Sequence, residues 1–113
     1  MQWLTPRMGT GSVRGMTVKL VVLYTQPDDP EAFESHYLSV HMPLVAAMPG
    51  LQKAESGKVA GRNQPFYRIT ELWFADQDAL NAAGSSAAGK ATNVDYAEIA
   101  PPGSHLLVQV LDD

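Results

Sequence analysis

The chain has 113 residues, of which 45% are hydrophobic, so its length suits a single domain with a modest core. Twelve acidic and eight basic residues give a net charge of −4, and no cluster of Lys and Arg could follow a phosphate backbone, which disfavours nucleic acid as a partner. Cysteine is absent, which excludes disulfides, thiolate nucleophiles and cysteine-ligated metal sites.

Residues 1–15 differ in composition from the rest of the chain. They are rich in glycine and contain two arginines but no acid. We predict a flexible tail over 1–15 and one domain over 16–113. Because no apolar run is long enough to span a bilayer and the N-terminus lacks the apolar core of a secretory signal, we expect a cytoplasmic protein with no membrane association.

The first predicted element is a strand over residues 17–24, where β-branched and other apolar residues predominate. Side chains alternate between the two faces of a strand, and here both faces are largely apolar. Each face must therefore be covered by another part of the protein. One face carries Val18, Leu20, Val22 and Tyr24, and the other carries Lys19, Val21 and Leu23.

A helix is predicted to begin at Pro30, with Asp28 or Asp29 as its N-cap, and to end near residues 49–50. Pro43 lies inside this helix, where a proline removes a backbone donor and costs roughly 3 kcal/mol unless the helix bends or restarts there. We therefore expect a bend or a restart of the helix at Pro43. The apolar positions at helical spacing are Phe33, Tyr37, Val40 and Leu44.

The remaining elements follow from alternation, turn residues and caps. They are a weaker strand over 51–60, a strand over 66–74 that forms a hairpin with it, a short helix over 79–83 capped by Asp76 or Asp78, a second helical piece over 86–97, and a last strand over 106–111.

This order, β-α-β-β-α-β, predicts an α+β fold of the ferredoxin-like type, with a four-stranded antiparallel sheet. Both helices of such a plait lie on one face of the sheet. Because the first and last strands are apolar on both sides, we expect the other face to pack against the sheet of an identical subunit. The predicted partner is therefore a second copy of the chain, as a homodimer.

Several segments together resemble the EthD family, and the most specific is the pattern His-Tyr-x-x-x-His-x-Pro-Leu. The likeness extends over about residues 17–111. It implies a dimeric α+β barrel that needs no cofactor and is similar to cyclases, decarboxylases, isomerases and monooxygenases acting on aromatic or polyketide-like molecules. The segments that carry it are Lys19–Tyr24, Asp29–Phe33, His36–Leu44, Pro49–Leu51 and Glu71–Phe74.

His36 and His41 are the first candidate catalytic residues, because imidazole exchanges a proton near neutral pH and so serves as a general acid or base. Five residues apart on an ideal helix, they should diverge by roughly 140° and face different surroundings. The competing interpretation is that either histidine is a packing residue bonded to backbone near the helix break.

Glu71 is the third candidate catalytic residue. Alternation places it on one face of its strand with Tyr67, Ile69 and Trp73, where desolvation would raise its pKa and a histidine could pair with it. The alternative is a structural ion pair with Lys19 or Lys58, or a contact across the dimer interface.

Aromatic side chains are the candidate substrate-binding residues, because ligand pockets are mostly apolar with few polar groups. The same residues could instead fill the core between sheet and helices. No metal site is expected, since the histidine spacing lacks a helical two-histidine pattern, and no nucleotide-binding loop is present. The candidates are Tyr24, Tyr37, Tyr67, Trp73 and Tyr96.

Two functions fit these observations. The first is a cofactor-independent enzyme that moves a proton on an apolar or aromatic small molecule bound between sheet and helices. The alternative is a non-catalytic dimeric binding or accessory subunit of an oxidative degradation system, in which the histidines only shape the helix.

Overall fold

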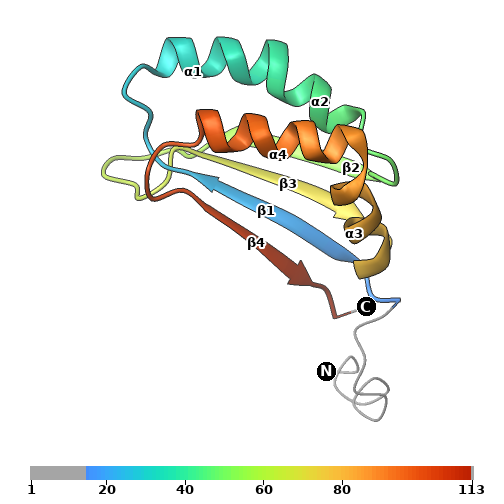
Figure 1. Cartoon of the computed structure of the whole chain (residues 1–113). Coiled ribbons are helices and arrows are strands. Elements are labelled where there is room, and N and C mark those ends of the chain that lie inside the picture. Colours follow the sequence, from blue (N-terminus) through green and yellow to red (C-terminus); the bar gives the residue numbers. More distant parts are fainter. Residues whose placement is uncertain (1–14, 113) are drawn as a thin grey trace.

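The computed structural model describes residues 15–112; the predicted tail therefore lies almost entirely outside the described residues. Figure 1 shows one sheet with the helices above it. The elements are β1 (Val18–Tyr24), α1 (Pro30–His36), the π-helical turn η2 (Tyr37–His41), α2 (Met42–Ala46), β2 (Lys53–Lys58), β3 (Arg68–Phe74), α3 (Gln77–Ser85), α4 (Ala87–Ile99) and β4 (His105–Val110).

The sheet has the strand order β2-β3-β1-β4, and every neighbouring pair is antiparallel. All the helices lie on one side of it, so the other face, called here the outer face, is uncovered (Figure 1). The predicted ferredoxin-like α+β fold with a four-stranded antiparallel sheet is confirmed.

Side-chain caps fix where two of the helices begin. The Asp29 carboxylate accepts a hydrogen bond from the backbone N–H of Ala32 at 3.1 Å, and Pro30 occupies the first turn of α1. Asp76 caps α3 in the same way, through the N–H of Ala79 at 2.8 Å. These contacts satisfy donors that a helix start leaves without partners.

The core lies between the helices and the sheet. It consists of two clusters that meet along β1, one under α2 and α3 and the other under α1 and η2. The buried members of the first are Val18, Val45, Met48, Leu72, Phe74, Leu80 and Ala83, and those of the second are Val22, Tyr24, Phe33 and Tyr37.

The first helix is interrupted by a π-turn directly before Pro43. The backbone N–H of Met42 bonds to the carbonyl of Tyr37, five residues back, so η2 holds one residue more than an α-turn. The disturbance precedes Pro43, which sits in the first turn of α2. Proline is tolerated there because that position needs no N–H donor. The helix therefore restarts at Pro43, which is one of the two outcomes expected, and the π-turn before it is a further distortion that the sequence analysis does not include.

The extra residue also changes which side chains face the sheet. Val40 is 42% exposed, whereas His41 is 4% exposed and buried in its place, followed by Val45. The expected apolar face through Val40 and Leu44 is thus wrong beyond Tyr37, because the π-turn rotates all that follows it.

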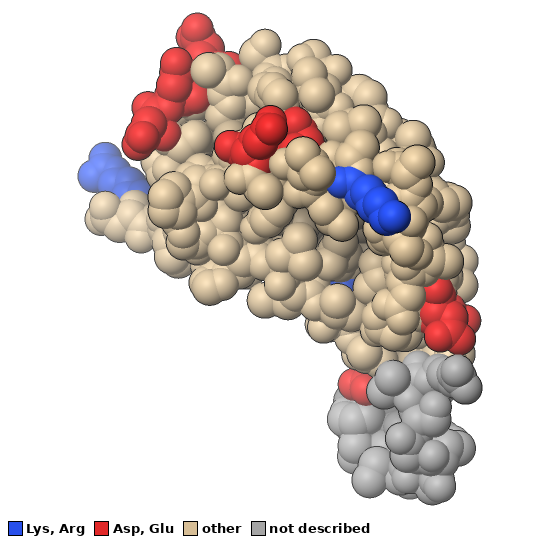
Figure 2. Space-filling model, in the orientation of Figure 1, with Lys and Arg blue, Asp and Glu red and all other residues tan. Residues whose placement is uncertain are grey.

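Two apolar side chains on the outer face of the sheet remain exposed to solvent. Ile69 is 36% exposed and Leu107 is 46% exposed. On the face that Figure 2 shows, Lys and Arg are scattered and form no basic stripe.

Within residues 15–112, no helix combines the length and apolar character needed to cross a membrane.

Candidate functional site

His36 and His41 meet on a single carboxylate, that of Asp95 on α4. The Nε2 atom of His36 lies 2.7 Å from Oδ1 of Asp95, and Nδ1 of His41 lies 2.8 Å from Oδ2. The side chains of His41 and Asp95 are 5% and 9% exposed, whereas that of His36 is 37% exposed. The expected divergence of the two imidazoles is therefore wrong.

The π-turn is the reason that the two histidines converge. In η2 the backbone bonds run from residue i to i+5, so residues five apart lie nearly one above the other. His36 and His41 have this separation, and both face α4. The ideal-helix geometry used for the prediction assumes 100° per residue throughout, which does not hold across this turn.

Asp95 was not among the predicted site residues. It lies on the buried face of α4, three residues after Thr92, which follows Gly89 by another three. The sequence does contain one indication of this site, because Asp95 lies at helical spacing from the other residues on the buried face of α4. A carboxylate buried on such a face requires a hydrogen-bond or ion-pair partner. Its distance of 54 residues from His41 hid that partner from local analysis.

The charge of Asp95 is stabilised by its two neighbours. Desolvation raises the pKa of Asp95, but hydrogen bonds and charge from His36 and then His41 outweigh that effect and hold the pKa below its usual range. Because an ionised carboxylate only accepts hydrogen bonds, each histidine donates an N–H to it. This fixes the proton of His41 on Nδ1 and leaves Nε2 as the nitrogen able to accept one.

Tyr24 lies at the other nitrogen of His41, with its hydroxyl 3.4 Å from Nε2. Burial raises the pKa of Tyr24 far above its usual value, and the nearby Tyr37, Tyr96 and Asp95 add to this effect. The phenol therefore stays protonated and can donate. Asp95, His41 and Tyr24 form a line of three groups in which His41 holds the only nitrogen that can accept a proton.

A small cavity of about 30 Å³ adjoins this line, between the sheet and α4. The space holds about one water-sized group. No Lys, Arg, Asp or Glu is among its lining residues, so His41 supplies the polar chemistry together with phenols, hydroxyls and an amide. The lining residues are Leu20, Val22, Tyr24, His41, Val45, Met48, Thr70, Leu72, Thr92, Asn93, Tyr96 and Leu106.

Tyr37 packs against the imidazole ring of His41. Its ring stacks on the imidazole with centroids 5.5 Å apart and an interplanar angle of 23°. Its hydroxyl contacts Thr70 and, at 2.8 Å, Ser56. The guanidinium of Arg68 lies over the other side of the ring, 4.6 Å from its centroid. The imidazole is thereby held at a fixed angle to the sheet.

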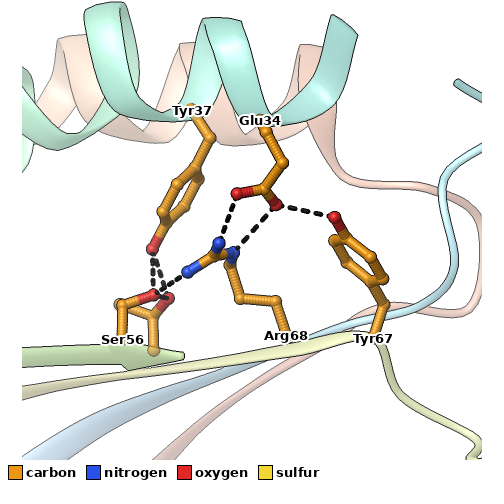
Figure 3. A network of polar contacts seen from close by, with 6 residues as sticks. Glu34, Tyr37, Ser56, Tyr67 and Arg68 are labelled. Atoms are coloured by element: carbon orange, nitrogen blue, oxygen red, sulfur yellow. Dashed lines mark hydrogen bonds and ion pairs between the residues drawn. The ribbon is translucent and has the colours of Figure 1, made fainter. Parts of the chain in front are cut away.

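Figure 3 shows how this packing is anchored, with Glu34 and Tyr37 descending from the helix to meet residues of the sheet. Glu34 accepts hydrogen bonds from Arg68 and, at 2.8 Å, from the hydroxyl of Tyr67. Desolvation raises the pKa of Glu34, but these bonds and the Arg68 charge outweigh it and lower the pKa overall. Arg68 is thus paired with Glu34 within the fold.

Glu71 does not reach the histidines. It lies on the outer face, and its carboxylate accepts a bond from the Lys19 ammonium at 3.1 Å. The expectation that a histidine pairs with Glu71 is wrong, and the alternative ion pair with Lys19 is the one observed. Alternation groups Glu71 with its neighbours but does not say which face of the sheet the helices cover.

The five aromatic candidates divide between the two sides of the sheet. Trp73 lies on the outer face, where the ammonium groups of Lys19 and Lys53 are 5.0 and 4.6 Å from its ring centroid. Tyr67 lies before the start of β3, so the alternation of that strand does not apply to it, and its side chain lies on the helix side of the sheet. Of the candidates, Tyr24 and Tyr96 line the cavity, and Tyr37 stacks on the ring of His41.

No group of three or more His, Asp or Glu side chains suited to a metal ion occurs among residues 15–112. Asp95 occupies the space between the two imidazoles and accepts a bond from each. The arrangement therefore suits proton transfer rather than coordination.

The chain is similar to known proteins over most of its length. The sequence profile of the EthD domain matches residues 26–102. An uncharacterized 11.0 kDa protein from the thcB-thcC intergenic region of Rhodococcus erythropolis is 30% identical over 92 residues, which span 79% of this chain and 89% of the relative. A crystal structure of an EthD family protein from Bacillus halodurans C-125 superposes with a TM-score of 0.80 at 32% identity, covering 85% of this chain and 99% of the other.

More distant structures share the fold. A dimeric ferredoxin-like protein of unknown function from Thermobifida fusca has a TM-score of 0.70 at 17% identity, covering 86% of this chain and 92% of the other. SnoaB, a cofactor-independent oxygenase from Streptomyces nogalater, has a TM-score of 0.63 at 17% identity, covering 85% of this chain and 93% of the other.

Proposed function

The chain belongs to the EthD family, and we propose that it binds a small, neutral, largely apolar molecule at the cavity beside His41 and moves a proton on it without a cofactor. The observation that carries this proposal is a buried imidazole whose Nδ1 is held by Asp95 and whose Nε2 adjoins an otherwise uncharged cavity. A base in such surroundings is held in one tautomer and one orientation.

The chemistry follows from the three groups in line. Nε2 of His41 accepts a proton from the bound molecule, and the imidazolium that forms keeps its Nδ1–H bond to the Asp95 carboxylate. The negative charge of Asp95 stabilises this cation without itself taking the proton. In the return step, the same nitrogen gives the proton back to another atom of the molecule, as an isomerisation requires.

Tyr24 adds a donor next to that base. Its phenol stays protonated and lies 3.4 Å from Nε2, so it can donate to an oxygen atom that enters the cavity. A donor and a base side by side match a molecule in which a carbonyl or hydroxyl oxygen lies beside an acidic hydrogen. The cavity accepts this reacting end, and Leu106 at its wall, 44% exposed, offers apolar surface for the remainder.

The relatives are compatible with this proposal. SnoaB, described as a cofactor-independent oxygenase, has the same fold, so a plait of this type can support a reaction without a resident cofactor. The dimeric neighbour from Thermobifida fusca supports the further proposal that this chain acts as a homodimer.

Exchange of carbon-bound hydrogen tests the proposed base directly. Acetone and cyclohexanone in D₂O exchange their α-hydrogens when a base removes one to form the enol and deuterium returns. We expect the protein to accelerate this exchange, measured by proton NMR, and His41→Gln to reduce the acceleration about 100-fold. His105→Gln is the matched control, because that histidine lies on β4 outside the cavity lining.

Two outcomes would contradict the proposal. Equal exchange rates with wild type and His41→Gln would show that His41 is not the base. No acceleration with either ketone, together with no saturable binding of them by chemical-shift perturbation, would favour the accessory-subunit alternative.

A further inference from the structure

The cavity beside His41 opens between α4 and β4. Among its lining residues in the described part of the chain, only Asn93 on α4 and Leu106 on β4 are exposed. The other lining side chains are buried or half-buried. A molecule bound at His41 therefore extends to the surface between Asn93 and Leu106.

An apolar surface continues from this opening along β4. Leu106 is the sheet neighbour of Val22, which belongs to the core under the helices. Val108 is the sheet neighbour of Leu20, which packs against the same core. Because neighbouring residues of adjacent strands share a face, Leu106 and Val108 both lie on the helix side. Residues two apart on a strand are separated by about 7 Å, so the surface continues for that distance.

This surface of Leu106 and Val108, called here the β4 track, is uncovered. Leu106 is 44% exposed and Val108 is 43% exposed. β4 is an edge strand, and Figure 1 shows it at the margin of the helix layer. The second subunit expected on the outer face would cover Leu107 instead, because that side chain lies on the opposite side of the strand.

The inner end of the site is much smaller than the track. The cavity volume of about 30 Å³ suits one group of the size of a water molecule or a methyl group. The Tyr24 hydroxyl and Nε2 of His41, 3.4 Å apart, lie at this end. A carbonyl carbon bound there can direct only a small substituent inward, and a larger one must point outward over Leu106.

We propose that the β4 track binds the apolar chain of a linear methyl ketone, whose methyl group occupies the cavity. The substrate class rests on the function proposed for His41, whereas binding of the chain is measurable without any reaction. Continuity identifies the occupant, because Leu106 belongs to both the cavity wall and the track. The two β4 side chains have no polar group, as suits the apolar part of a ligand.

Three ketones separate the effect of chain length from that of carbonyl position, with dissociation constants measured by chemical-shift titration of the protein. Methyl hexyl ketone has four methylenes more than methyl ethyl ketone. It should bind about tenfold more tightly, because each methylene contributes roughly a factor of two on a surface that covers one side of the chain. Propyl butyl ketone is its isomer and should bind about tenfold more weakly, because neither substituent fits the cavity.

Two variants of β4 test the track itself. Val108→Ser should remove most of the preference for methyl hexyl ketone over methyl ethyl ketone. Leu107→Ser is the matched control and should retain it, since Leu107 is 46% exposed on the outer face of the same strand. A preference that falls equally in both variants would assign the track to a second subunit and overturn the inference. Equal affinities for the two isomeric ketones would also overturn it.

This experiment and the exchange experiment can fail separately. Preferential binding of methyl hexyl ketone without acceleration of hydrogen exchange would remove the role of His41 as a base and leave the β4 track in place. Accelerated exchange of acetone without any preference for the longer chain would leave the base in place and refute the track.

Discussion

The charged carboxylate of Asp95, a residue that is 7% exposed, lies against two imidazoles. Hydrogen bonds from both imidazoles offset the cost of its desolvation. Removing one partner of such a cluster leaves the others buried without compensation. The carboxylate therefore joins α4 to the π-turn as well as orienting the candidate base.

The pH dependence of stability should report this residue. The pKa of Asp95 is lower in the folded state than the unfolded value of about 3.9, so the unfolded chain binds more protons as the pH falls. The stabilisation from Asp95 is therefore complete above about pH 5 and is lost as the pH falls through its folded-state pKa.

For Asp95→Asn, we expect a loss of about 2 kcal/mol of unfolding free energy at pH 7 and a smaller difference from wild type in acid. Urea denaturation at several pH values measures both. Glu55→Gln is the control, because the Glu55 side chain is 59% exposed, and it should match wild type throughout. A loss for Asp95→Asn that is equally large below pH 3 would contradict the assignment of a charged Asp95.

Among the secondary-structure elements, the corner between α3 and α4 depends on one glycine. A Cβ atom at Gly89 would lie 2.0 Å from the carbonyl oxygen of Ala83 and 2.8 Å from Cα of Gly84. The backbone N–H of Gly89 also bonds to the Ser86 hydroxyl that caps α4. Because the nearest atoms all belong to the backbone of Ala83 and Gly84, no flexible side chain can move aside at this corner.

Substitution at the two glycines of this corner should have opposite effects. Gly89→Ala should lower the unfolding free energy by about 3 kcal/mol through overpacking. Gly84→Ala is the matched control, since its Cβ would meet nothing within 4 Å and alanine is the better helix former. Thermal unfolding compares them, and equal melting temperatures would refute the close packing.

Local signals predicted most elements because strands and caps depend on nearby residues. The Asp29 and Asp76 caps and the alternation of β1 are of this kind. The side of the sheet that receives the helices is not determined locally, and for that reason the sequence could not decide between the two interpretations of Glu71 or place Trp73 on the outer face. The pairing of Asp95 with the histidines likewise arises only when α4 packs beside α1 and η2.

The π-turn had a weak signature in the sequence. Phe33, Tyr37, His41 and Val45 recur every four residues, which is longer than the 3.6 residues of an α-helical turn. The apolar positions predicted from α-helical spacing include Val40 in place of His41. The spacing alone could have indicated one additional residue.

At the scale of the whole molecule, the uncovered face of the sheet is where we expect a second subunit to pack. Apolar side chains on the outer face include Ile69 and Leu107, both substantially exposed in the single chain. A second sheet packed on this face would remove them from water.

Light scattering after gel filtration tests this assembly. We expect wild type to elute as a dimer and Leu107→Lys to shift the population to monomer, because the substitution introduces a charge into the contact. Val94→Lys is the control, since Val94 is 62% exposed on α4, on the helix side of the sheet. A monomeric wild-type protein, or a dimer that Leu107→Lys leaves intact, would place the interface elsewhere.

The π-turn has a consequence for how histidine spacing is compared between chains. Two histidines four residues apart on an ordinary α-helix share a face, and here two histidines five apart share one through η2. Removal of one residue from this turn, with an ordinary α-helical turn in place of η2, would therefore leave the pair of imidazoles directed at the same carboxylate. Chains whose histidine spacings differ by one residue can possess the same site, and a search for a fixed spacing would separate them.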